Sequence, residues 1–133
     1  VCDRENSRIQ LFSSDGELLA IWDDVARPCQ AFVTGDLVYV AELGFHAGVF
    51  PWNTLDRSRT GGRVSVFDRA GKLLHRWGGG RDPASPEDFY SPHDIQVDSE
   101  GSVYVAEVKV SAARPSGADS SGFPSLRKFE PVL

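Results

Sequence analysis

Few side chains in this sequence have the chemistry to bind a metal ion or to act as acid or base. Of the three histidines, His75 alternates with apolar residues in a strand-like segment, which indicates a structural role. His46 lies in a glycine-bounded loop, where it is either an exposed loop residue or a ligand or acid–base group. His93 follows a proline at the start of another strand-like segment. Because zinc needs three or four ligands, one histidine is not a site.

The two cysteines, Cys2 and Cys29, form no CxxC pair, and they predict no disulfide scaffold. Cys29 holds, after its own proline, the place that His93 holds in a later segment. It is therefore either a soft metal ligand or a buried free thiol. The pairing state of the two thiols stays open at this point.

An internal repeat supplies the elements that must position these residues. Residues 8–24 align without a gap with residues 63–79, which matches Arg, Phe, Gly, Leu-Leu and Trp at the same offsets. Each copy predicts a β-hairpin that turns at a glycine and ends at a tryptophan. A second hairpin type recurs in residues 27–42 and 91–107. Joined in order, the two hairpins make the four-stranded blade of a β-propeller.

The strand pattern predicts an all-β fold, a β-propeller of which about two and a half to three blades are present. The first residues resemble the tail of a strand, so we expect the chain to be truncated at its N-terminus. We expect one partial domain over residues 1–133, made of an incomplete blade 1–26, a full blade 27–80 with a long loop 44–62, and a near-complete blade 91–133 with a long loop 109–125.

Residues that recur between the copies indicate architecture rather than chemistry. We expect the aromatic ones to pack between blades. The recurring pairs are Arg8 and Arg63, Phe12 and Phe67, Trp22 and Trp77, and Tyr39 and Tyr104.

The long connections alternate with short turns, so antiparallel pairing places the long loops on one face of the fold. Binding sites often lie in such loops, although tolerated surface insertions give the same pattern. The loop that contains His46, Phe50 and Trp52 is the candidate ligand-binding loop. Together with Phe45, its aromatic residues either form a recognition surface for a peptide or small ligand or pack as a lid on their own blade.

Two motifs carry a resemblance to a known family. The stretches DRENSRIQ at 3–10 and PHDI at 92–95, the second followed by DSEGSVYV at 98–105, resemble NHL-repeat proteins. More narrowly, they are similar to the C-terminal half of the six-bladed ring in the peptidyl-α-hydroxyglycine α-amidating lyase family and its bacterial relatives. The resemblance implies a zinc ion held by three histidines from different blades, with His93 as the last ligand. It also implies that Arg4 is an active-site arginine that contacts the substrate.

The other histidines and the catalytic tyrosine of that family have no match in this chain, so the resemblance implies an incomplete zinc site. Strand order places Arg4 and His93 on the same face, and we expect both to face one volume. Arg4 is either a substrate anchor or half of a structural ion pair with Asp3, with Glu5 or with a neighbouring blade. Two functions remain in view: a zinc-dependent lyase-like enzyme that needs a complete ring, and a non-catalytic scaffold that binds a protein, peptide or small ligand.

Composition limits the partners further. A formal net charge of −5 with interspersed signs disfavours a nucleic-acid partner. No apolar run approaches the roughly 20 residues of a membrane span, and the sequence specifies no compartment. Two to three blades leave apolar end faces and sheet edges uncovered. We therefore expect self-association or pairing with the missing half of a ring.

Overall fold

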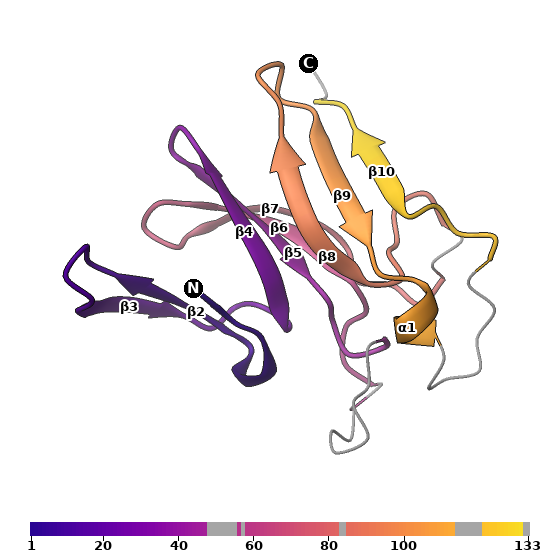
Figure 1. Ribbon diagram of the computed structural model, residues 1–133, viewed down its shortest axis with the longest axis horizontal. Helices are drawn as coiled ribbons and strands as arrows, with labels where there is room; N and C mark the ends of the chain where they lie inside the picture. The colour runs from indigo at the N-terminus through magenta and orange to yellow at the C-terminus, as the bar shows by residue number, and fades with distance from the viewer. Residues whose placement is uncertain (48–55, 57, 83–84, 114–120, 132–133) are drawn as a thin grey trace.

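The computed structural model describes residues 1–47, 56, 58–82, 85–113 and 121–131. Within them, ten strands form three antiparallel sheets (Figure 1). The first sheet contains β1 (Cys2–Asp3), β2 (Arg8–Phe12) and β3 (Leu18–Trp22). The second contains β4 (Pro28–Thr34), β5 (Leu37–Glu42), β6 (Arg63–Asp68) and β7 (Leu73–Gly78). The third contains β8 (Pro92–Val97), β9 (Val103–Glu107) and β10 (Leu126–Phe129).

Helices are almost absent from the described residues. A 3₁₀ turn covers Arg4–Asn6, and the single-turn helix α1 covers Val110–Ala113. No helix in this part of the chain has the length and apolar character to cross a bilayer. The all-β prediction is confirmed, and β4 to β7 are hydrogen-bonded in the order that two joined hairpins predict.

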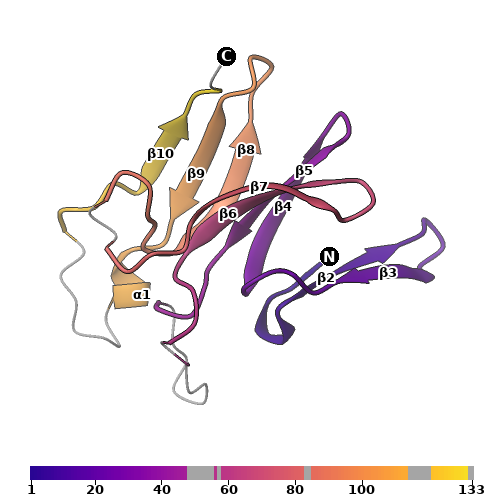
Figure 2. The same cartoon turned by 180° about the vertical axis from the view of Figure 1, so that it is seen from behind.

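The three sheets stand next to one another, with the second between the first and the third (Figures 1 and 2). One apolar cluster joins the first sheet to the second and includes Ile9, Val40 and Phe67. Another joins the second to the third and includes Val64 and Val105. Alternate residues of each strand face opposite sides of a sheet, so the middle sheet can contribute to both clusters.

A tryptophan–phenylalanine contact recurs at both junctions between sheets. Trp22 of β3 lies 5.6 Å from Phe67 of β6, and Trp77 of β7 lies 5.6 Å from Phe129 of β10, measured between ring centroids. The expected inter-sheet packing is thus present at these tryptophans. The prediction of inter-sheet packing is wrong for Phe12, which is 42% exposed because no described sheet lies on its side of β2.

Of the two recurring tyrosines, only Tyr39 packs against the cluster between the second and third sheets. The expectation is wrong for Tyr104. Its hydroxyl instead donates a hydrogen bond to Asp98 at 3.1 Å, and the ammonium of Lys128 lies 5.9 Å from its ring. Tyr104 faces away from the second sheet because it alternates along β9 with valines that face toward it.

A carboxylate–arginine ion pair recurs near the same end of each sheet. The pairs are Asp3–Arg8 at 2.7 Å, Glu42–Arg63 at 2.8 Å and Glu107–Arg127 at 2.8 Å. Glu42 is fully buried, and it also accepts hydrogen bonds from the Ala26 amide and the Ser65 hydroxyl. Arg8 and Arg63 therefore have the architectural role that their recurrence indicated. A buried carboxylate whose oxygens all accept hydrogen bonds holds the strands that contact it in position.

Candidate functional site

Two equivalent irregularities shape the start of the strands β4 and β8. The cross-strand register skips Cys29 in β4 and His93 in β8, so each is the extra residue of a β-bulge. A bulge leaves one residue unpaired and changes the direction of its side chain. The sequence similarity between these two positions thus corresponds to a shared backbone feature.

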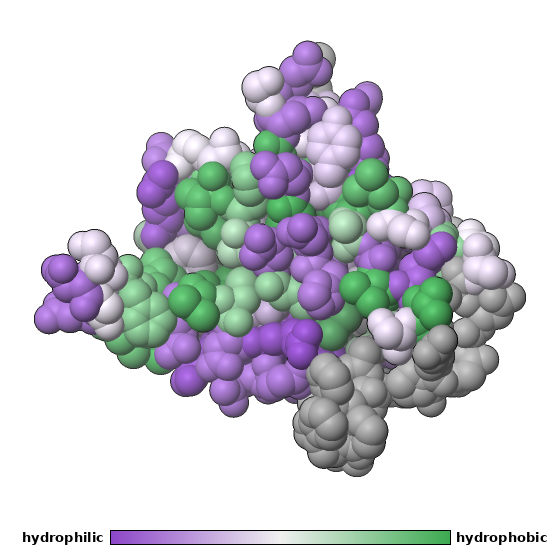
Figure 3. All heavy atoms as spheres, viewed as in Figure 1, coloured by the Kyte–Doolittle hydropathy of each residue, from purple (hydrophilic) through white to green (hydrophobic). Residues whose placement is uncertain are grey.

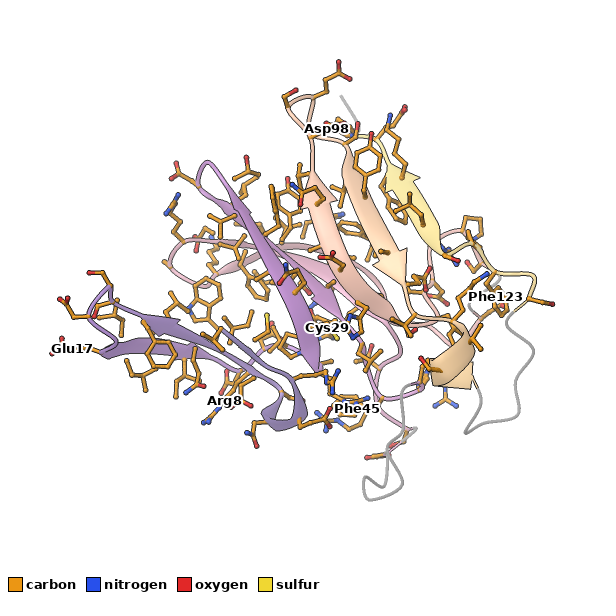
Figure 4. The ribbon with its side chains drawn as sticks, in the orientation of Figure 1. Arg8, Glu17, Cys29, Phe45, Asp98 and Phe123 are labelled. Atoms are coloured by element: carbon orange, nitrogen blue, oxygen red, sulfur yellow. The ribbon has the colours of Figure 1, made fainter. Side chains whose placement is uncertain are left out.

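These two side chains border the same hollow as Arg4. The hollow has a volume of about 360 Å³, and it lies beside the end of β4 at which Figure 4 shows Cys29. The structure therefore brings together Arg4 and His93, as the strand order predicted. The residues that line the hollow are Cys2, Asp3, Arg4, Glu5, Cys29 and His93. We call it the Arg4–His93 pocket.

Two larger hollows, of about 610 and 410 Å³, lie between neighbouring sheets. Their linings are mainly apolar, with Tyr39, Trp77 and Phe129 in one and Leu11, Trp22 and Val38 in the other. They hold few groups able to do chemistry, so we regard them as grooves between imperfectly closed sheets. The Arg4–His93 pocket is the candidate site because charged and nucleophilic groups converge on it.

A network of charged groups holds Arg4 in place. Glu5 accepts from Nε of Arg4 at 2.8 Å and from Nη2 of Arg27 at 3.0 Å. The Arg27 side chain is almost wholly buried, and its Nη1 donates to the carbonyl oxygens of Gly44 and Ala47, both at 3.1 Å. Arg4 is thus a partner in a structural ion pair, yet its side chain remains 30% exposed and accessible to a ligand.

The pKa of the Glu5 carboxyl reflects the same network. Partial burial raises this pKa, but the hydrogen bonds from Arg27 and Arg4 outweigh burial and leave the pKa below its ordinary value. Glu5 therefore stays ionised at neutral pH and keeps both guanidinium groups oriented. Sequence reasoning did not identify Arg27, because an arginine before a proline gives no signal of burial.

Both cysteines are free thiols and only partly exposed. Burial raises the pKa of Cys2 and of Cys29, and the nearby Arg4 guanidinium partly opposes this rise at Cys29. Because burial disfavours the thiolate, both groups are mainly protonated at neutral pH. Of the two interpretations of Cys29, the partly buried free thiol matches this environment.

The other candidate residues lie elsewhere. His46 Nε2 lies 2.7 Å from the carbonyl oxygen of Arg59, and the ring of His75 lies against Trp77 at 5.7 Å on β7. Phe45 is buried beneath the Arg59 guanidinium, so it is a packing residue and not part of a recognition surface.

The other two residues proposed for the ligand-binding loop, Phe50 and Trp52, lie outside the described residues. His46 and Phe45 are the parts of that loop which the structure does describe, and both are engaged with Arg59.

The residues at the pocket do not by themselves fit a zinc ion. Among the described residues, no three histidine, cysteine, aspartate or glutamate side chains are arranged to hold a metal. A structural or catalytic zinc site needs at least three protein ligands. Zinc binding at His93 would therefore need ligands from beyond the described residues.

No protein-family model matches the chain, and no curated protein matches it.

Proposed function

We propose that the three sheets are consecutive blades of an NHL-type β-propeller and that the Arg4–His93 pocket binds the carboxylate end of a peptide or small ligand. The observation that carries the ligand proposal is the convergence of Arg4 and His93, from the first and third sheets, on one pocket. The blade assignment is supported by the repeated strand order and by the repeated Trp–Phe contact between neighbouring sheets.

The charges around the pocket favour an anionic ligand. The charged residues that line the pocket are Arg4, Asp3 and Glu5. Each of the two carboxylates also pairs with an arginine outside the lining, Asp3 with Arg8 and Glu5 with Arg27. These neighbours neutralise the carboxylates, so they do not cancel the charge that Arg4 offers to a ligand. A guanidinium that is oriented by a carboxylate and partly exposed can donate to a ligand carboxylate through its planar fork.

His93 and the thiol of Cys29 border the same volume and supply further polar contacts. Each lies in a bulge whose strand pairs with its neighbour immediately before and after it, which holds this part of the pocket rigid. A rigid pocket loses little conformational entropy on binding, which favours a specific ligand over a passing ion.

Calorimetry with a short peptide tests this proposal. A tripeptide with a free C-terminal carboxylate should bind more tightly than the same tripeptide with a C-terminal amide. Arg4→Gln should weaken carboxylate binding by about tenfold or more, because it removes a charge-assisted hydrogen bond. Arg69→Gln is the matched control, since Arg69 is exposed and makes its contacts at Gly35 and Asp36 in a distant turn. Equal binding of the two peptides, or equal loss in both variants, would contradict the proposal.

A second candidate function is a zinc-dependent lyase-like activity in a complete ring. It is favoured by one observation, that Arg4 and His93 share a pocket as the family resemblance implies. Metal analysis of the full-length protein after dialysis against zinc tests it, with His93→Ala as the test variant and His75→Ala as the control. If the protein has this function, it should bind stoichiometric zinc, and only His93→Ala should lose it. Absence of zinc, or zinc retained in His93→Ala, rules it out.

A further inference from the structure

We propose that Cys2 and Cys29 are a reversible disulfide site, at which oxidation joins the first sheet to the second beside the Arg4–His93 pocket. The observation that carries the inference is that the only two cysteines of the chain come from different sheets and line the same pocket. The site goes beyond the proposed ligand function, and only its effect on ligand affinity rests on that function.

The backbone brings the two cysteines close to each other. The strand β1 contains only Cys2 and Asp3, and Cα atoms of this strand lie within 8 Å of Cα atoms of β4, which contains Cys29. Figures 1 and 2 both show the N-terminal strand beside β4. A disulfide needs Cα atoms about 4.4 to 6.8 Å apart, so the two strands are near the spacing that this bond requires.

The two side chains also face each other's sheet. Cys2 packs against the apolar cluster that joins the first sheet to the second, so its side chain points toward the second sheet. Burial is the largest cause of the raised pKa of Cys2, and a negative charge on Cys29 raises this pKa further. Because such an electrostatic effect falls with distance, the two sulfur atoms lie within range of each other.

The bulge in β4 gives the Cys29 side chain freedom to turn. Cys29 is the residue that the register of β4 with β5 skips, so it has no cross-strand partner to lose. A change of its χ1 rotamer can therefore move the sulfur toward Cys2 while the rest of β4 stays paired.

A small oxidant can reach this site. Both cysteines are partly exposed, and the ion pairs Arg4–Glu5 and Arg8–Asp3 lie beside them. In the space-filling view, hydrophilic spheres gather along the lower edge of the first sheet, where Figure 4 shows Arg8 (Figure 3). The pocket therefore opens to water through a charged rim.

The reaction is exchange with glutathione disulfide, a low-molecular-weight disulfide. The Cys29 thiolate, which the Arg4 guanidinium stabilises, attacks one sulfur of the reagent and forms a mixed disulfide. One glutathione leaves as a thiolate and takes up the proton that Cys29 lost. The Cys2 thiolate then attacks the Cys29 sulfur and releases the second glutathione in the same way. The protein loses two hydrogen atoms and two electrons, and one glutathione disulfide is reduced to two glutathione molecules.

The bond fixes the segment that carries Arg4. The 3₁₀ turn Arg4–Asn6 begins directly after β1, so a link from Cys2 to β4 holds this turn against the second sheet. The link also restricts the unfolded chain, and the midpoint of thermal unfolding should rise by at least about 5 °C. Because a guanidinium held in place loses less entropy on binding, the oxidised protein should bind a peptide carboxylate about threefold more tightly.

Mass spectrometry after incubation with glutathione disulfide at about pH 8.5, where more of each thiol is ionised, tests the proposal. The wild-type monomer should lose about 2 Da and carry no glutathione, and a peptide map should contain the Cys2–Cys29 link. Dithiothreitol should restore both thiols. Cys2→Ser should stop at the mixed disulfide, because it has no second thiol to displace glutathione.

Cys2→Ser combined with Ser14→Cys is the matched control. This variant keeps two thiols, but the second lies in the exposed turn between β2 and β3, at the far end of β2 from Cys2. It should carry two glutathione molecules and no link.

Four results would overturn the disulfide site: no reaction of the wild type, two stable mixed disulfides in the wild type, a link that forms only between chains, or an equal yield of linked monomer in the control. Unchanged peptide affinity in the linked protein would overturn the effect on the pocket. If neither the reduced nor the oxidised protein binds the peptide, the proposed ligand function fails, whereas the mass measurement still decides the disulfide.

Discussion

The indole of Trp22 lies 5.6 Å from the ring of Phe67, which connects the last strand of the first sheet to the third strand of the second. Gly71, in the hairpin turn that follows Phe67, lies against the same indole. One aromatic side chain thus fixes both a strand and a turn of the neighbouring sheet. The first sheet has an exposed counterpart of Phe67, which is Phe12, and an uncrowded counterpart of Gly71, which is Gly16. Substitutions at these counterparts therefore serve as controls for substitutions at Phe67 and Gly71.

Truncation of Phe67 should destabilise the fold much more than the same change at Phe12. Phe67→Ala removes a ring that is 1% exposed and should cost about 3 to 5 kcal/mol of the free energy of unfolding. Phe12→Ala removes a ring that is 42% exposed and should cost less than about 1 kcal/mol in dilute protein. Urea denaturation of both variants measures the difference. Similar costs would show that the two positions are equally packed in solution.

The glycines of two equivalent turns should respond differently to alanine. Gly16 and Gly71 have φ values of +88° and +86°, so alanine is strained by a similar amount at both, about 1 kcal/mol. A methyl group at Gly71 would also overlap the indole of Trp22, whereas nothing lies within 4 Å at Gly16. Thermal unfolding should therefore show a clearly larger loss for Gly71→Ala, by about 1 to 3 kcal/mol. Equal losses would mean that Trp22 moves away at no cost.

Removal of the buried carboxylate of Glu42 should be among the most damaging changes. Glu42→Ala leaves the Arg63 guanidinium, the Ser65 hydroxyl and the Ala26 amide without their shared acceptor, at a cost of about 3 to 5 kcal/mol. The exposed pair of Glu130 with Lys128 provides the control, and Glu130→Ala should change stability by less than about 1 kcal/mol. Chemical denaturation checks both. A small effect at Glu42 would show that water replaces the carboxylate.

Alkylation kinetics should report the environment of Cys29. Burial raises the pKa of this thiol, so in a Cys2→Ser background iodoacetamide should react with a pH midpoint above that of free cysteine. The Arg4 guanidinium lowers the same pKa, so Arg4→Gln should move the midpoint to still higher pH. A midpoint that does not move in Arg4→Gln would show that Arg4 is not close to the Cys29 sulfur.

The sequence alone determined the strands and their order, because alternation of apolar and polar residues and the glycines of tight turns act over a few residues. The gap-free match of residues 8–24 with 63–79 predicted equivalent hairpins, and β2–β3 and β6–β7 confirm them. Strand order also placed Arg4 and His93 at one end, since antiparallel pairing fixes the end at which each strand begins.

Tertiary structure decided everything that depends on contacts between sheets. Burial of Arg27 and its bond to Glu5 join residues that are far apart in the sequence, and no local pattern encodes that contact. The different exposure of Phe12 and Phe67 has the same origin, because they hold equivalent positions in two hairpins and another described sheet lies against Phe67 alone. Local sequence therefore specified the repeating unit, whereas packing of one unit on the next determined which of its residues are core, pocket or open surface.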